Sequence, residues 1–270
     1  MGTQSASRAL LLLRHIGAQH SQGLRLTDLI ALTGLDKSTI HRLLACLMEE
    51  GFIERVPGAK SYRLGIESVQ LGLVAPDMAP LVGKFRPAMM KIARICEESV
   101  FLVARSGHYA VCVHKESGAF ASSMSTVHPG TRRVLGVSAV GVSILANEHD
   151  DELTSTYRQN AELYECMGMS LNGIHKLVDV TREKGFSEMT SFGPLGTSGV
   201  GYAFPVSDTT HIGISIAGSN MRMDPQRRLE LGRLLRVEMD SLSFHAPQTA
   251  IADGERKVKG KEKGFKAPKN

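Results

Sequence analysis

Residues 27–46 read TDLIALTGLDKSTIHRLLAC, and this stretch decides the fold of the N-terminal part of the chain. Two short amphipathic segments flank a turn at residues 33–35. Apolar residues of the second segment recur at the helical spacing i, i+3, i+4, i+7: Ile40, Leu43, Leu44 and Leu47. Asp36 directly precedes this segment and is a favourable N-cap residue. The stretch therefore predicts two helices joined by a tight turn, the second with one buried and one exposed face.

The exposed face of the second predicted helix carries basic and hydroxyl side chains. In helix-turn-helix proteins, the N-terminal residues of this helix contact base edges in the major groove of DNA. Five residues are therefore candidates for contacts with bases and phosphates: Lys37, Ser38, Thr39, His41 and Arg42. The alternative interpretation of this segment alone is a charged, solvated helix on any small helical domain.

The flanking sequence favours a DNA-binding domain. Residues 9–16 are mostly apolar and predict a buried first helix, and Gly51 is a suitable residue to end the second. Two β-rich runs, residues 52–56 and 61–64, are joined by a Pro-Gly turn and predict a hairpin. Together these elements are typical of a winged helix. Two residues of the wing are expected to contact the sugar-phosphate backbone: Lys60 and Arg63.

The order of these motifs resembles the N-terminal domain of IclR-type bacterial transcriptional regulators. The segments that carry the resemblance are SASRALLLLRHI, GLDKSTIHRLLACLMEEGFIER and YRLG. It continues into the family's effector domain through FRP at residues 85–87, the segments 92–100 and 130–146, TREKGFSEM and IGISIAGSNMRM. The resemblance covers about residues 5–245 and implies a DNA-binding domain followed by an effector-binding domain.

The chain is predicted to be an α+β protein with an N-terminal winged helix-turn-helix domain, a linker helix and a C-terminal α/β effector domain with a mainly antiparallel sheet. We expect four parts: DNA-binding domain 1–65, linker helix 66–80, effector-binding and oligomerisation domain 81–250, and disordered basic tail 251–270. Predicted helices of the effector domain are 85–98, 138–147, 150–160, 170–185 and 224–243. Its predicted strands are 100–104, 109–113, 200–206 and 211–216.

Composition and charge fit a DNA-binding regulator. Residues 1–64 carry eight Lys/Arg and five Asp/Glu, residues 65–250 carry 17 and 19, and residues 251–270 carry seven and three. Positive charge thus lies at the DNA-binding end and in the tail, whereas a general polyanion binder would be basic throughout. No apolar run approaches the ~20 residues of a membrane helix, and the four scattered cysteines suit reduced thiols, so we expect a cytoplasmic protein that does not enter membranes.

The middle of the chain lacks the sequence motifs of common enzyme active sites. Residues 196–201 read GTSGVG, but a GxSxG nucleophile elbow would need glycine at position 200, which is valine. The stretch also lacks the third glycine of a dinucleotide-binding loop. The ten histidines form no HExxH motif. We therefore expect no catalytic residues, no metal site and no cofactor.

Small residues at 136–141 stand where a helix is predicted to begin, and free N–H groups there attract an anion such as a carboxylate. Close packing of helix on sheet is the alternative role for these residues. The resemblance implies a ligand pocket and, matched residue by residue, nominates Ser138, Ala139, Thr190 and Ser215. The resemblance also nominates Ser191, Thr197 and Ser198 from the same part of the chain. Arg132 and Arg133 would supplement carboxylate binding unless, like most loop arginines, they are solvated.

The chain departs from the family pattern in the same region. Many members have a proline and a Gly-Lys pair where this chain has Val134 and Gly141-Val142. Acidic residues that are common after the position of Glu188 are replaced by the sequence Met-Thr-Ser-Phe. Effector contacts through that lysine or those carboxylates therefore do not carry over.

The predicted function is a sequence-specific transcriptional regulator of double-stranded operator DNA, controlled by a small organic acid, aromatic acids included. One recognition helix reads only a few base pairs, so a homodimer on a two-fold operator is expected, and the resemblance implies a dimer of dimers. Two alternatives remain at this point. One is a metabolite-processing enzyme with an appended DNA-binding domain, and the other is a nucleoid-type structural DNA binder without operator preference.

Overall fold

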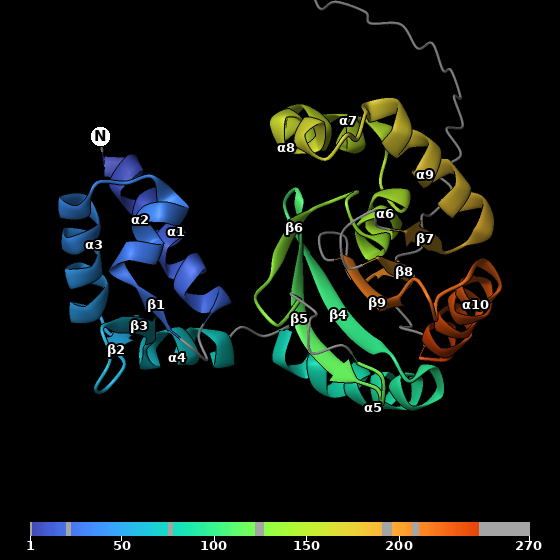
Figure 1. The fold of residues 1–270 in the computed structure, drawn as a ribbon, viewed down its shortest axis with the longest axis horizontal. Coiled ribbons are helices and arrows are strands. Elements are labelled where there is room, and N and C mark those ends of the chain that lie inside the picture. Colours follow the sequence, from blue (N-terminus) through green and yellow to red (C-terminus); the bar gives the residue numbers. More distant parts are fainter. Residues whose placement is uncertain are drawn as a thin grey trace, which may run out of the picture.

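Six stretches of the chain are described by the computed structural model: residues 2–19, 23–74, 78–121, 127–190, 196–206 and 211–242. They form an N-terminal and a C-terminal domain, drawn at the left and right of Figure 1. The predicted basic tail, residues 251–270, and Ser191 lie outside the described residues. Within these stretches, no helix combines the length and the apolar character that crossing a membrane requires.

The N-terminal domain is a winged helix. Its helices are α1 (Gly2–Ala18), α2 (Leu26–Thr33) and α3 (Lys37–Glu49). Its strands, β1 (Leu24–Arg25), β2 (Ile53–Arg55) and β3 (Ser61–Leu64), form an antiparallel sheet in the order β1-β3-β2. The apolar stripe predicted for the second helix is turned inward, since Ile40, Leu44 and Leu47 are buried against Leu12, Ile16 and Leu29.

Local chemistry sets the angle between α2 and α3. Gly34 ends α2 in the left-handed conformation, with φ of 64°, and its N–H donates to the Ile30 carbonyl at 2.9 Å. Two residues later, the Asp36 carboxylate accepts a hydrogen bond from the Thr39 N–H at 2.8 Å and caps α3. The tight turn predicted from the sequence therefore consists of the C-cap of α2 followed two residues later by the N-cap of α3.

The C-terminal domain is built on a six-stranded sheet in the order β6-β5-β4-β9-β8-β7, and each of its strand pairs is antiparallel. The strands are β4 (Ser99–Ser106), β5 (Tyr109–Ser117), β6 (Arg132–Val134), β7 (Ser187–Thr190), β8 (Thr197–Pro205) and β9 (His211–Ser219). The predicted α+β class with a mainly antiparallel sheet is confirmed.

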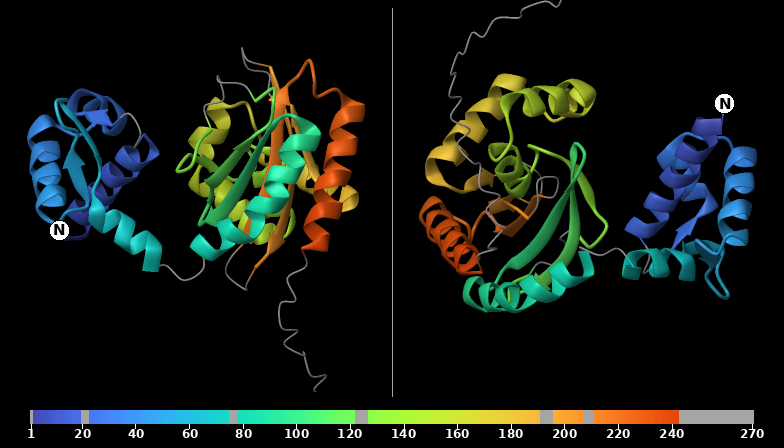
Figure 2. Two further views of the ribbon diagram at one scale, coloured as in Figure 1. Left: turned by 90° about the horizontal axis from the view of Figure 1, so that it is seen from below. Right: turned by 180° about the vertical axis from the view of Figure 1, so that it is seen from behind.

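Helices cover both faces of this sheet, as the left view of Figure 2 shows. One face carries α5 (Met78–Cys96) and α10 (Pro225–Ser241). The other face carries α6 (Ala139–Ala146), α7 (Asp150–Gln159), α8 (Ala161–Cys166) and α9 (Leu171–Lys184). The linker helix α4 (Ile66–Val74) follows the wing.

Side chains along the central strands point alternately to the two faces of the sheet, so each strand contributes to the hydrophobic core on both faces. In β4, Val100 and Leu102 face the core under α5 and α10, whereas Phe101 and Val103 belong to the core under α6. A strand that is apolar on both faces is typical of a sheet with helices on both sides.

The structure corrects several predicted boundaries. The helix expected at 85–98 begins earlier, at Met78. Pro80 is tolerated in its first turn, because a missing N–H there costs no hydrogen bond. Pro87 lies within the helix. Three strands and one helix were missed: β1, β6, β7 and α8. These elements are two to six residues long, so they show too little periodicity to be recognised.

Two helical glycines give a matched test of the packing of α10. A Cβ on Gly232 would lie 2.1 Å from Cε2 of the buried Phe186 ring, whereas a Cβ on Gly83 in α5 would meet nothing within 4 Å. We expect Gly232→Ala to destabilise the fold by about 1–3 kcal/mol through overpacking. Gly83→Ala should stabilise it by about 0.5–1 kcal/mol, because alanine loses less chain entropy in a helix. Equal shifts in the midpoint of denaturant unfolding would contradict this packing.

Candidate nucleic-acid interface and ligand cavity

The exposed face of α3 presents three cationic or titratable side chains to solvent: Lys37, His41 and Arg42. In Figure 1, α3 lies on the outer side of the N-terminal domain, away from the C-terminal domain. Nothing in the described part of the chain covers this face, so a DNA duplex would meet it directly. The structure thus brings the predicted recognition residues together on one accessible surface.

The Asp36 carboxylate organises the start of α3. It accepts hydrogen bonds from the hydroxyls of Ser38, at 2.6 Å, and Thr39, at 2.7 Å. These bonds hold the pKa of the Asp36 carboxyl far below its usual range, and the bond from Ser38 has the largest effect. The carboxylate is therefore ionised at every physiological pH. Both hydroxyls donate to Asp36 in the free protein, but their oxygens still accept bonds from base amino groups.

On the wing, one of the two predicted DNA-contacting cations is already paired with an acidic side chain. Arg63 pairs with Glu54 across the hairpin, with Nε and Oε1 2.5 Å apart, because the two residues face each other in the β2–β3 register. Lys60 stands in the exposed hairpin turn. Of the two residues predicted to contact the DNA backbone, Lys60 is the more accessible. To bind a phosphate, Arg63 would have to leave Glu54 or contact the carboxylate and the phosphate together.

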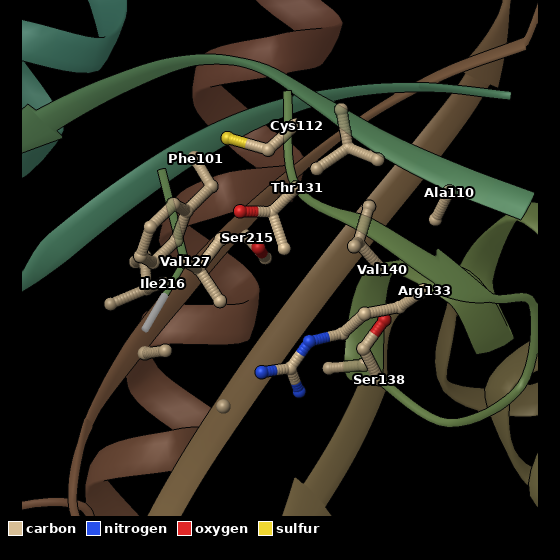
Figure 3. A pocket seen from close by; sticks show the side chains of 14 residues that line it. Phe101, Ala110, Cys112, Val127, Thr131, Arg133, Ser138, Val140, Ser215 and Ile216 are labelled. Carbon is tan, nitrogen blue, oxygen red and sulfur yellow. The ribbon is translucent and has the colours of Figure 1, made fainter. Parts of the chain in front are cut away.

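A cavity of about 110 Å³ lies between the sheet and the start of α6. Its apolar lining includes Phe101, Val103, Ala110, Cys112, Val127, Val140 and Ile216, and its polar lining includes Thr131, Arg133, Ser138 and Ser215. Figure 3 shows these side chains around a common space. Three predicted effector residues therefore meet at one cavity: the adjacent Ser138 and Ala139, and Ser215 from a distant part of the sequence.

The start of α6 is held against the sheet by small residues. A Cβ on Gly201 of β8 would lie 2.5 Å from the Val140 nitrogen, so only glycine permits this approach. Ser138 caps α6 by accepting a hydrogen bond from the Gly141 N–H at 3.2 Å, which leaves its hydroxyl proton free to donate elsewhere. The two roles considered for these small residues, packing and a polar helix start at a cavity, therefore coexist.

The other predicted effector residues occupy different places. Ser198 is buried, its Oγ donates to Asn220 Oδ1 at 2.6 Å, and it lies 3.2 Å from Thr190 Oγ1. Thr190 and Thr197 are exposed on β7 and β8. None of these three is among the described residues that line the cavity, and their role in effector binding stays a prediction.

The two adjacent arginines of β6 have separate environments. The Arg132 guanidinium lies over the Tyr109 ring, 4.7 Å from its centroid, whereas Arg133 lines the cavity. Sequence reasoning also missed the apolar wall formed by Phe101, Val103 and Cys112. Strand alternation alone does not tell which of a strand's two faces borders an unfilled space, so no signal in the sequence identifies this wall.

Cys112 keeps the wall of the cavity uncharged. Burial raises the pKa of its thiol to about 11, so the group is protonated at neutral pH. Its Sγ lies 3.5 Å from the His114 carbonyl oxygen, which it approaches as a weak donor. Among the described residues, no three His, Cys, Asp or Glu side chains are grouped as a metal site would require.

Comparison with known proteins identifies the family. The model of the IclR helix-turn-helix domain matches residues 5–57, and that of the bacterial transcriptional regulator IclR C-terminal domain matches residues 75–244. The chain belongs to the IclR family. Its relatives include the HTH-type transcriptional regulator KipR of Bacillus subtilis, 28% identical over 77% of this chain and 84% of that protein. The DNA-binding transcriptional repressor YiaJ of Escherichia coli is 25% identical over 90% and 87%.

Solved structures show the same fold. An IclR transcriptional regulator from Alicyclobacillus acidocaldarius superposes with a TM-score of 0.70 and 19% identity, over 89% of this chain and 97% of that one. The IclR family regulator from Brucella abortus gives a TM-score of 0.65 with 19% identity, over 88% and 91%. The IclR-family chain is accordingly a transcriptional regulator with a helix-turn-helix DNA-binding domain, and its matched families and relatives are regulators rather than enzymes.

The exposed α3 face leads to a prediction about DNA binding. Arg42→Ala and Lys37→Ala should each weaken operator binding by about 1–3 kcal/mol, because each removes a contact to a base or phosphate. Folding should be unchanged, since both side chains are exposed on the face opposite the buried stripe. Arg233→Ala, at an exposed position of α10, removes the same charge far from α3 and is the control. Operator binding by the Arg42 variant at wild-type strength in a gel-shift titration would contradict the assignment.

Proposed function

We propose that this IclR-family regulator binds a small organic acid, aromatic acids included, in the cavity at the start of α6, and that the bound acid changes its affinity for operator DNA. The observation that carries the proposal is the cavity itself, which is mostly apolar but has Ser138, Ser215 and Arg133 in its wall. Binding sites for small molecules are typically apolar spaces with a few polar groups that fix orientation.

The proposed DNA contacts come from α3 and the wing. Lys37, Ser38, Thr39, His41 and Arg42 would enter the major groove, with Lys60 and Arg63 on the adjacent backbone. The exposed cations of α3 suit the phosphates, and the Ser38 and Thr39 oxygens suit base amino groups. A general DNA-binding role would need no ligand cavity, which favours a regulated, operator-specific protein.

One turn connects the cavity wall to the DNA-binding domain. Val127 and Thr131 line the cavity, and the turn between them contains Gly130, with φ of 91°. A Cβ on Gly130 would lie 3.5 Å from the Cα of Ala18 at the end of α1. Burial, and after it the positive charge of Arg14 on α1, lower the pKa of the neighbouring Arg132 guanidinium. A ligand that moves this turn would alter the placement of α1, and ligand and operator binding would then be reciprocally linked.

We also propose that the chain acts as a homodimer, assembled further into a dimer of dimers. The linker helix α4 exposes large apolar side chains: Ile66, Val69, Leu71 and Leu73, of which Leu73 is 71% exposed. Ile66, Val69 and Leu73 follow i, i+3, i+7 spacing and share one side of α4, whereas Leu71 lies on the other side. An exposed apolar face on a short helix is typical of an interface. A second copy covering this face would hold two α3 helices for two half-sites of an operator.

Ser138→Asp tests the location of the effector site. Aspartate is a good N-cap, so α6 should keep its start, but the new carboxylate would repel a ligand carboxylate. We expect loss of ligand affinity by more than the roughly 0.5–1.5 kcal/mol of one hydrogen bond. Ser170→Asp makes the same change at the exposed N-cap of α9, outside the cavity lining, and should leave affinity unchanged. Calorimetric titration with small carboxylic acids provides the comparison.

Ser215→Ala belongs in the same titration and should weaken binding more mildly, since it removes one hydroxyl without adding charge. Operator binding without ligand should be similar in all variants, because these residues lie far from α3 in the fold. Wild-type ligand affinity in both Ser138→Asp and Ser215→Ala would place the effector elsewhere. The small residues of the α6 start would then serve packing alone.

The dimer is tested at α4. Replacing Val69 and Leu73 together by glutamate should lower the dimer fraction in sedimentation and weaken binding to a two-fold operator, because charge is costly to bury in an interface. Binding to a single half-site should change little. Leu71→Glu adds a charge at an exposed position on the opposite side of the same helix and serves as the control. An unchanged dimer in the double variant would show that α4 is not the contact.

A further inference from the structure

We propose that Arg133 anchors the ligand and thereby restricts it to one chemical class: a monocarboxylate with a single compact, uncharged apolar body. The inference deepens the proposed function and rests on it. It concerns the identity of the charge partner and the class of acid, which the fold and the family leave open.

The first observation is the register of β6. Arg133 pairs with Ala110 of β5, and directly paired residues of neighbouring strands share a face of the sheet. Ala110 lines the cavity, so Arg133 is directed to the same side. Arg132 pairs with Val111 and lies on the opposite face, where it stacks on Tyr109. Two adjacent arginines are thus separated by strand alternation into one with an aromatic partner and one at the cavity.

The second observation is that Arg133 has no protein partner. Among the described residues, no hydrogen bond or ion pair engages its guanidinium, and no acidic side chain lines the cavity. Figure 3 shows the Arg133 side chain extended along the cavity beside Ser138. Other arginines of this domain, such as Arg105, Arg222 and Arg228, are each bound to a glutamate. Arg133 is exposed, so its guanidinium reaches solvent as well as the cavity that it lines. An unpaired guanidinium beside an apolar cavity favours an anionic ligand, and its planar fork suits two carboxylate oxygens.

The rest of the lining excludes further charge on the ligand. Phe101, Val103 and Cys112 line the same space as Arg133, and Cys112 stays protonated. A second carboxylate or an ammonium group placed against them would be desolvated without a partner. Sugars and other polyhydroxylated molecules would leave most of their hydroxyls unpaired. The body of the ligand should therefore be hydrocarbon.

The volume limits the size of that body. The cavity of about 110 Å³ is smaller than the roughly 150 Å³ apolar cavity that admits a benzene molecule. A branched or small cyclic hydrocarbon of about four or five carbons fits that space, with the carboxylate at Arg133 and the hydroxyl of Ser138. Suitable probes are 3-methylbutanoate and cyclopentanecarboxylate, each with its uncharged amide, with benzoate as a larger acid that should bind more weakly and glutarate as a dicarboxylate.

The experiment compares Arg133→Met, Arg133→Lys and the matched control Arg132→Met by calorimetric titration of the full chain with these probes. Wild type and Arg132→Met should bind at least one monocarboxylate about tenfold or more tightly than its amide. Arg133→Met should bind acid and amide alike, and Arg133→Lys should restore part of the preference. Melting temperatures of the Arg133 variants should match wild type, because the side chain has no protein partner to lose.

Each other outcome has a definite meaning. Retention of the preference for the acid in Arg133→Met would overturn the role of Arg133 but leave the effector proposal intact. Tighter binding of the amide or of glutarate by wild type would overturn the ligand class alone. If none of the probes binds wild type or alters its binding to operator DNA, the ligand class is wrong. Failure of a wider screen of organic acids would then overturn the proposed function itself.

Discussion

The close approach of α6 to the sheet is the constraint on which the C-terminal domain depends. Gly201 and Gly213 leave room for the first turn of the helix, since a Cβ on either would overlap Val140. Hydrogen bonds complete the contact, with Ser187 Oγ donating to the Ala139 carbonyl and Ser143 Oγ donating to the Gly201 carbonyl at 2.7 Å. Because the backbone of the helix rests on the strands, its N-cap is held at the edge of the space that the remaining side chains leave unfilled.

The two domains use positive charge in opposite ways. On α3, Lys37 and Arg42 are exposed, where they retain their hydration and suit a polyanion such as a phosphate backbone. Arg133 is exposed as well, but it borders a mostly apolar wall, beside which one charge pair has a larger effect on which molecule binds. The near-neutral charge of residues 65–250 and the excess of positive charge in residues 1–64 reflect this division.

The segment from Val127 to Val134 links these features. It contributes Thr131 and Arg133 to the cavity, and its Gly130 turn approaches the end of α1. β6 is an edge strand of three residues, and among the described residues β5 is its only partner. A short edge strand is held by fewer hydrogen bonds than a central strand, so it suits a wall that must respond to a ligand. The proposed coupling therefore places the adjustable element between a rigid sheet and the DNA-binding domain.

The sequence by itself determined the winged helix, because its signals are local: Asp36 and Gly34 delimit helices, and the apolar spacing of Ile40, Leu44 and Leu47 is periodic. It also indicated the antiparallel class of the second domain and placed Ser138 at a helix start. Only the tertiary structure decided which serines share a cavity, since Ser138 and Ser215 meet through strand pairing over long sequence separation, whereas Ser198 bonds to Asn220. The separate fates of Arg132 and Arg133 likewise depend on the register of β6 with β5, which three residues are too few to reveal.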